Sequence, residues 1–106
     1  MPVPLQVGQL AVSKAGRDAG HAFIIIGIDG DRYVRVADGR GRTGKRPKVK
    51  NVRHLQVHRQ VDDGIARQLQ AGKLVADEIL QQVLQAMLKE AEDRTSTGKG
   101  ETDDRG

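Results

Sequence analysis

A chain of 106 residues is long enough for one domain and a short appendage. It contains no cysteine, which excludes disulfides and thiolate zinc sites. The net charge of +4 is unevenly spread: residues 1–60 carry twelve Lys/Arg and four Asp, a net +8, whereas residues 61–106 carry six Lys/Arg and ten Asp/Glu, a net −4. This asymmetry predicts a polyanion-binding module followed by an element of another kind.

The sequence shows no sign of a membrane or secretory protein. Its longest apolar run, Ala22 to Ile28, has seven residues, far fewer than the roughly 20 that a membrane-spanning helix needs. The N-terminal Met-Pro-Val-Pro-Leu lacks the basic region and apolar stretch of a signal peptide. We therefore expect a cytoplasmic protein that does not bind membranes.

The first sixty residues have the pattern of short β-strands. Residues 9–12 place Leu and Val on one face, and residues 22–28 are rich in the β-branched residues of a central strand. Asp-Gly-Asp at 29–31 predicts a tight turn, and the alternation in 32–36 predicts the second strand of a hairpin with its valines inward. We expect one or two further strands between residues 48 and 58. Short strands separated by turns are typical of a small barrel.

The remaining residues predict two helices and a tail. Asp62 or Asp63 can cap a first helix that runs to Ala71 and ends at Gly72, and Asp77 can cap a second helix to about Glu92. The second helix carries an apolar stripe that we expect to pack on the barrel or on another helix. The stripe consists of Ile79, Leu80, Val83, Leu84, Met87 and Leu88. Residues 94–106 contain no large apolar side chain, which predicts a disordered tail.

The stretch from Gly8 to Gly39 resembles a KOW motif. In that family the loop between the first two strands carries a near-invariant glycine, which Gly20 matches, and Gly16 lies in the preceding tight turn. A glycine reaches positive φ and allows a phosphate to approach the backbone closely. The resemblance implies an RNA-binding edge formed by Gly20 and the side chains around it, Lys14, Arg17 and His21.

Residues 38–56, DGRGRTGKRPKVKNVRHLQ, resemble the continuation of this motif in bacterial KOW-domain RNA-binding proteins. Those proteins are related to the e-type large-subunit ribosomal protein family number fourteen of archaea and eukaryotes. The resemblance covers about residues 8–58 and implies an SH3-like β-barrel that binds RNA. The expected fold is mainly β with α: an SH3-like (KOW) barrel over residues 1–60, a helical appendage over 61–93 and the tail over 94–106.

A basic cluster forms the second edge of the expected RNA site. It consists of Arg40, Arg42, Lys45, Arg46, Lys48, Lys50 and Arg53. Seven positive charges without an intervening acid repel one another, and a polyanion relieves that repulsion while releasing counterions. The alternative interpretation is a mobile, solvated loop. The neighbouring KOW-like segment favours phosphate binding.

The few aromatic and histidine residues argue against a base-stacking site and against a metal site. Phe23 lies in an apolar strand and is expected in the core, so Tyr33 alone could stack on a base. Recognition by RNA shape and phosphate contacts is therefore expected. His54 and His58 share one strand face but lie roughly 13 Å apart, too far for one metal ion. Without a nucleophile–base pair or phosphate-loop signature, we expect no enzyme, no cofactor and no small-molecule substrate.

Three functional hypotheses follow from the sequence. The first is binding of ribosomal RNA or another structured RNA in translation. The second is a protein-interaction module, in which an edge of the barrel or the helix at 77–92 docks a partner such as a ribosomal protein. The third is an auxiliary factor whose barrel binds RNA and whose helix binds protein.

Overall fold

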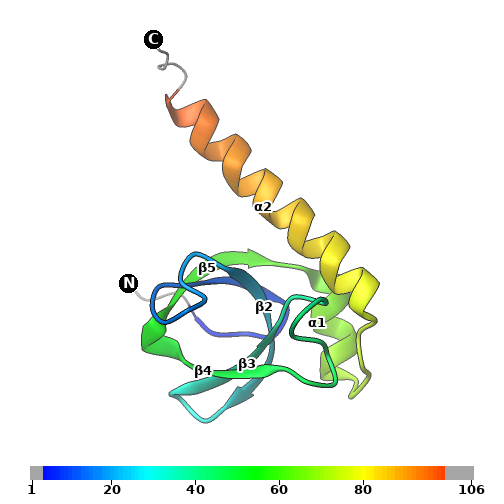
Figure 1. Ribbon diagram of the computed structural model, residues 1–106. Coiled ribbons are helices and arrows are strands. Elements are labelled where there is room, and N and C mark those ends of the chain that lie inside the picture. The colour runs from blue at the N-terminus through cyan, green and yellow to red at the C-terminus, as the bar shows by residue number, and fades with distance from the viewer. Residues whose placement is uncertain (1–3, 100–106) are drawn as a thin grey trace.

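Five strands and two helices make up this computed structural model, which describes the backbone of residues 4–99 and the side chains of residues 4–91. The strands are β1 (Gln9–Ser13), β2 (Ala22–Asp29), β3 (Tyr33–Ala37), β4 (Lys48–Asn51) and β5 (Leu55–Val61). A short 3-10 helix, η1 (Val52–His54), joins β4 to β5. The helices α1 (Asp63–Gln70) and α2 (Asp77–Lys99) follow, and α2 crosses the sheet and continues past it (Figure 1).

The strands form one antiparallel sheet in the order β4-β3-β2-β1-β5. The expectation of a mainly β fold followed by two helices is confirmed. A closed barrel is not confirmed, because β4 and β5 are the two edges and are not paired with each other among the described residues. Closure would require a ladder between these two strands. Instead, η1 turns the chain after only four residues of β4, and β5 then pairs with β1, with Leu55 opposite Ser13.

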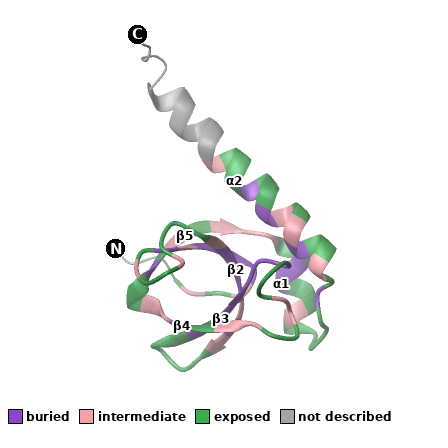
Figure 2. Ribbon diagram, in the orientation of Figure 1, coloured by how far each residue is buried: buried purple, intermediate pink, exposed green. Residues whose placement is uncertain are grey.

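Burial on both faces of the sheet explains the apolar run in β2. Because side chains alternate between faces along a strand, Ile24 points to one side and Phe23 and Ile25 to the other. Ile24 belongs to a cluster with the two helices, whereas Phe23 and Ile25 pack with Val34 and other residues inside the curve of the sheet. Figure 2 shows the buried strands at the centre and the exposed loops around them. The expected core position of Phe23, which is 2% exposed, is confirmed.

Local signals place both ends of α1. The carboxylate of Asp62 accepts a hydrogen bond from the backbone N–H of Ile65 at 2.9 Å, which is the expected N-cap. After the helix, Gly72 has φ +78°, the left-handed conformation with which a glycine commonly ends a helix. The predicted first helix is therefore confirmed at both ends.

The apolar stripe of α2 packs on the sheet, as expected. Leu80, Leu84 and Met87 are buried in one cluster with Leu10 of β1 and Ile24 of β2. The stripe is thus largely covered within the chain itself. Its remaining exposed members are Ile79 and Leu88, which are 39% and 40% exposed.

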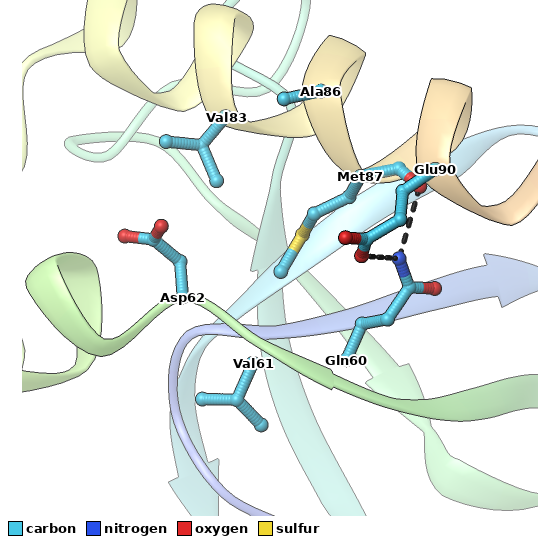
Figure 3. Close-up of a pocket in the computed structure, with 7 residues that line it drawn as sticks. All are labelled: Gln60, Val61, Asp62, Val83, Ala86, Met87 and Glu90. Carbon is cyan, nitrogen blue, oxygen red and sulfur yellow. Dashed lines mark hydrogen bonds between the residues drawn. The ribbon is translucent and has the colours of Figure 1, made fainter.

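A hydrogen-bonded contact attaches α2 to the edge strand β5. Figure 3 shows the Gln60 side-chain amide reaching up to the helix. Its Nε2 donates to the main-chain oxygen of Met87 at 3.0 Å and to Glu90 Oε1 at 2.9 Å. Together with the shared apolar cluster, this contact makes the helices part of one packed unit with the sheet.

The ends of α2 differ from the prediction. Asp77 is the first helical residue and not the cap, and its carboxylate bonds outside the helix. At the other end α2 continues to Lys99, past the expected end near Glu92, so residues 94–99 of the expected tail are helical. Each residue added to an existing helix gains one hydrogen bond, so the backbone can continue past the last apolar residue. Residues 100–106 of the expected tail lie outside the described residues. Within the described part, neither helix is long and apolar enough to cross a membrane.

Candidate nucleic-acid interface

The loop between β1 and β2, residues 14–21, is a closed hairpin connection. The backbone N–H of Gly20 donates to Ser13 O at 2.7 Å, and Ser13 N donates to His21 O at 2.9 Å. Gly20 has φ +87°, and a Cβ at this position would meet no atom within 4 Å. The left-handed backbone, and not crowding, therefore requires glycine here. The open space also leaves the backbone of Gly20 accessible to a ligand.

Asp18 of this loop lies at the centre of a hydrogen-bonded cluster. Its Oδ1 accepts from Lys50 Nζ at 2.8 Å and from Ser13 Oγ at 2.9 Å, and its Oδ2 accepts from Lys48 Nζ at 3.0 Å. The hydrogen bond from Lys50 holds the pKa of Asp18 well below its ordinary value. Burial acts in the opposite direction, but the further bonds from Lys48 and Ser13 reinforce the lowering. The cluster therefore ties the loop to β4.

This cluster corrects the expectation that the basic residues have no counter-charge. Lys50 is only 8% exposed and bonds to both Asp18 and Ser13, so its ammonium is not a free surface charge. Lys48 is partly exposed, with one contact to the same carboxylate. The acid is supplied from 32 residues earlier in the chain, which is why the local sequence did not reveal it.

A second acid, the buried Asp38, organises the basic loop, residues 38–46. Its Oδ1 accepts from the backbone N–H groups of Arg40 and Arg42, at 2.9 and 3.0 Å, and its Oδ2 lies 2.7 Å from His21 Nε2. Burial raises the pKa of Asp38, but the two backbone N–H groups and His21 outweigh burial and lower it overall. His21 therefore joins the two edges of the site, since its ring bonds to the basic loop.

The start of α2 supports the basic loop from the other side. Gln81 Nε2 donates to Gly39 O at 2.6 Å, and the N–H of Gly44 donates to Asp77 Oδ1 at 3.1 Å. Gly39 has φ +79°, and a Cβ there would overlap Asp77 O. The loop therefore lies directly on the first turns of the helix. The acidic helical half of the chain contributes to the geometry of the basic half.

Most of the predicted cations remain available to a ligand. The side chains of six residues are exposed and form no ion pair within the described part of the chain: Lys14, Arg17, Arg40, Arg42, Lys45 and Arg46. Between the two loops lies a shallow hollow of about 330 Å³, lined by Asp18, His21, Phe23, Asp38, Gly41, Arg42 and Lys48. We call it the charged hollow, because Arg42 and Lys48 stand at its wall together with the carboxylates of Asp18 and Asp38. Lys48 is paired with Asp18, so Arg42 is the group of this wall that is free to bind a phosphate.

Arg53 is separated from the predicted site residues of the basic loop. In the β3–β4 ladder, Lys48 pairs with Val36 next to the basic loop, whereas Asn51 pairs with Tyr33 at the far end of the strand. Arg53 follows that far end and lies beside Arg32 in a different hollow. The structure therefore places Arg53 away from the basic loop but near the start of the β1–β2 loop, where the backbone N–H of Lys14 donates to His54 O at 2.8 Å. Arg32, which the sequence analysis did not select, is the neighbour of Arg53.

Several organising residues were missed by reasoning from the sequence. Asp18 lies two residues from a glycine on each side, and Asp38 directly precedes one. An aspartate near a glycine is a local sign of a turn, but it does not reveal which distant side chain the carboxylate binds. Asp77 was interpreted as a helix cap, and Gln81 was not selected as a site residue. Their partners in the basic loop are 33 and 42 residues away. Within the described residues no group of three or more His, Cys, Asp or Glu side chains could hold a metal ion.

The curated proteins that this chain resembles include two of the same name. The chain is 35% identical to Large ribosomal subunit protein eL14 of Desulfurococcus amylolyticus over 52 residues, which cover 49% of this chain and 54% of that protein. It is 29% identical to Large ribosomal subunit protein eL14 of Staphylothermus marinus, with the same coverage. No family model matches the chain. The chain thus spans about half the length of the curated relatives it matches, and over that half its sequence supports the expected relation to the eL14 proteins.

Proposed function

We propose that this chain binds structured RNA, most specifically ribosomal RNA, through phosphate contacts from the basic loop and the β1–β2 loop. One observation carries the proposal: six exposed Lys and Arg side chains lie on two loops that Asp18 and Asp38 tie together. The similarity to proteins named as ribosomal subunit components supports it. The sheet is then an SH3-like unit of the KOW type, and the chain acts in translation as a binding protein and not as an enzyme.

Fixed loops favour this function over a solvated, mobile loop. Ordering a loop on binding costs conformational entropy, which lowers affinity. In this chain the two acids, Gln81 and Asp77 hold the loop backbones before any ligand arrives. The unpaired cations can then release counterions from phosphates without a large ordering cost.

The scarcity of exposed aromatic rings defines the mode of recognition. Phe23 is buried, and Tyr33, which is 46% exposed, lies at the far end of β3 from the basic loop. Readers of single-stranded RNA stack several bases on aromatic side chains. The proposed mode is therefore recognition of a folded RNA by its phosphate geometry, with little readout of sequence.

Removing three charges from the basic loop should weaken RNA binding and flatten its salt dependence. For the triple variant Arg42→Gln, Lys45→Gln, Arg46→Gln, we expect affinity for a ribosomal RNA fragment to fall on the order of 100-fold at low salt, with a slope of log K against log salt that is smaller by about 2–3. Fluorescence anisotropy at salt concentrations between about 50 and 300 mM measures both the affinity and the slope, because counterion release governs binding in this range.

The matched control removes three exposed charges elsewhere, with Arg67→Gln, Lys73→Gln and Lys89→Gln on or beside the helices. This variant has the same net charge as the first but keeps the basic loop. It should retain nearly the full salt slope. Equal losses in the two variants would mean that overall charge, and not this site, governs binding.

Sedimentation of a cell lysate on a sucrose gradient tests the ribosomal part of the proposal. We expect the protein to migrate with the large ribosomal subunit at low salt and to leave it at high salt or after nuclease treatment, because phosphate contacts are screened by salt. Migration at the top of the gradient in every condition would contradict a ribosomal target. Co-migration that resists nuclease would instead favour a ribosomal protein partner docked through α2.

A further inference from the structure

A second hollow lies beside the charged hollow and shares two of its residues. It has a volume of about 310 Å³ and is bounded by the β1–β2 loop, the basic loop and α2. His21 and Asp38 line both hollows, so their hydrogen-bonded pair forms the partition between them. We call the second one the apolar hollow, because its apolar lining comes from Val12, Ala22, Leu84 and Leu88.

The rim of the apolar hollow carries groups suited to a polar, planar ligand. Arg40 stands on it from the basic loop, and Gly20 contributes accessible backbone from the other loop. Of the two amides on the rim, Gln81 donates to Gly39 O. Gln85 is exposed, and its side chain has no hydrogen-bond partner among the residues described. A free amide beside an apolar wall can both accept from and donate to the edge of a base.

The two hollows together match the two parts of one nucleotide. A nucleobase has apolar faces and a hydrogen-bonding edge, whereas its phosphate is anionic. Arg42, which forms no ion pair among the described residues, can bind the phosphate on one side of the His21–Asp38 pair, and the Leu84 and Leu88 side chains can contact the base on the other. The apolar hollow lies at the small end of the roughly 300–1,000 Å³ range of ligand pockets. Arg40 can stack its guanidinium on a base.

Charge decides between a base and a protein side chain as the occupant. A partner would have to approach the apolar hollow past Arg40, which stands on its rim, is exposed and forms no ion pair among the described residues. This charge and the exposed cations of the adjoining basic loop attract an anionic polymer and oppose a neutral or basic protein surface. We therefore propose that the apolar hollow accepts one unpaired nucleobase of an RNA whose neighbouring phosphates lie on the basic loop. This inference rests on the proposed function and deepens it.

The test compares two RNA hairpins that share one stem and differ by a single unpaired adenosine. We expect the protein to bind the bulged hairpin about tenfold more tightly, which corresponds to the burial of roughly 60 Å² of apolar surface. The variant Leu88→Gln should lose this preference while keeping its affinity for the fully paired hairpin. Ile79→Gln is the matched control, since Ile79 lies on the same helix with nearly the same exposure but lines neither hollow.

A measurement on the unaltered protein guards against a variant that unfolds. The methyl NMR signals of Leu84 and Leu88 should shift when the bulged hairpin binds and should stay in place with the paired hairpin. Equal affinity for both hairpins, unmoved methyl signals, or a preference that survives Leu88→Gln would overturn the base-binding hollow and leave the proposed function standing. Failure to bind either hairpin would overturn the proposed function itself, and this inference with it.

Discussion

Replacing Asp18 by asparagine is expected to lower the free energy of unfolding by about 3 kcal/mol, the lower end of the range for breaking a buried ion pair. The carboxylate accepts from two lysines and a serine, and Lys50 is 8% exposed. Without the negative charge, the Lys50 ammonium stays out of water with only a neutral amide and Ser13 Oγ for partners. Urea unfolding at pH 7 measures the loss.

Two comparison variants isolate the cause. Asp29→Asn removes an exposed ion pair with Arg35 and should cost no more than about 0.5 kcal/mol. The double variant Asp18→Asn, Lys50→Met removes the buried charge as well and should recover most of the lost stability, because an apolar residue of similar size needs no counter-charge. If the double variant were no more stable than Asp18→Asn, the buried ammonium would not be the source of the loss.

The same carboxylate predicts how stability depends on pH. An aspartate in the unfolded chain titrates near its ordinary value of 3.8, and the folded pKa of Asp18 is lower. A depressed folded pKa stabilises the fold fully above the unfolded value, and this stabilisation is lost as pH falls toward the folded one. The unfolding free energy should therefore decline below about pH 4. The decline should be smaller in Asp18→Asn. An equal decline at acid pH in the two proteins would contradict the role of Asp18 in it.

Replacing Gly39 by alanine should destabilise the protein by about 3 kcal/mol, the sum of a left-handed backbone penalty and a steric overlap. The backbone has φ +79°, and the new Cβ would overlap Asp77 O and press on Gln81 and Leu80. The atom in the way belongs to the helix backbone, so relief requires α2 and the basic loop to separate. RNA affinity should fall as well, because that loop carries the cations.

Gly30→Ala provides the control for backbone conformation alone. Gly30 has φ +76°, but a Cβ there would meet nothing within 4 Å. This variant should lose only about 1 kcal/mol in thermal or urea unfolding, with unchanged RNA affinity. Similar losses for the two glycines would show that the close approach of the loop to α2 contributes nothing.

Local chemistry explains which parts of the fold were predictable. The hairpin turn after Asp29, the Asp62 cap and the end of α1 at Gly72 each depend on a few neighbouring residues, and all three are confirmed. The packing of the α2 stripe is also confirmed, since helical periodicity marks the buried face. The end of α2 was misplaced, because propagation of a helix depends weakly on side-chain type.

The candidate site likewise has features that the local sequence predicts and features that depend on the tertiary structure. The glycine at position 20 and the concentration of Lys and Arg between residues 40 and 50 are properties of the sequence alone. Which of those charges are free is a property of the tertiary structure, since Asp18 accepts hydrogen bonds from the buried Lys50 and from Lys48. The β3–β4 register likewise separates Arg53 from the basic loop.

The sequence by itself therefore determined the class of fold, the hairpin and helix positions, and the excess of positive charge in the first half. Only the tertiary structure decided that the sheet is open, that two aspartates join the two loops, and that α2 supports the basic loop. The reason is physical: turns, caps and amphipathic faces arise from residues a few positions apart. The decisive hydrogen bonds of the site connect residues 17 to 42 positions apart, and they form only when the whole chain packs.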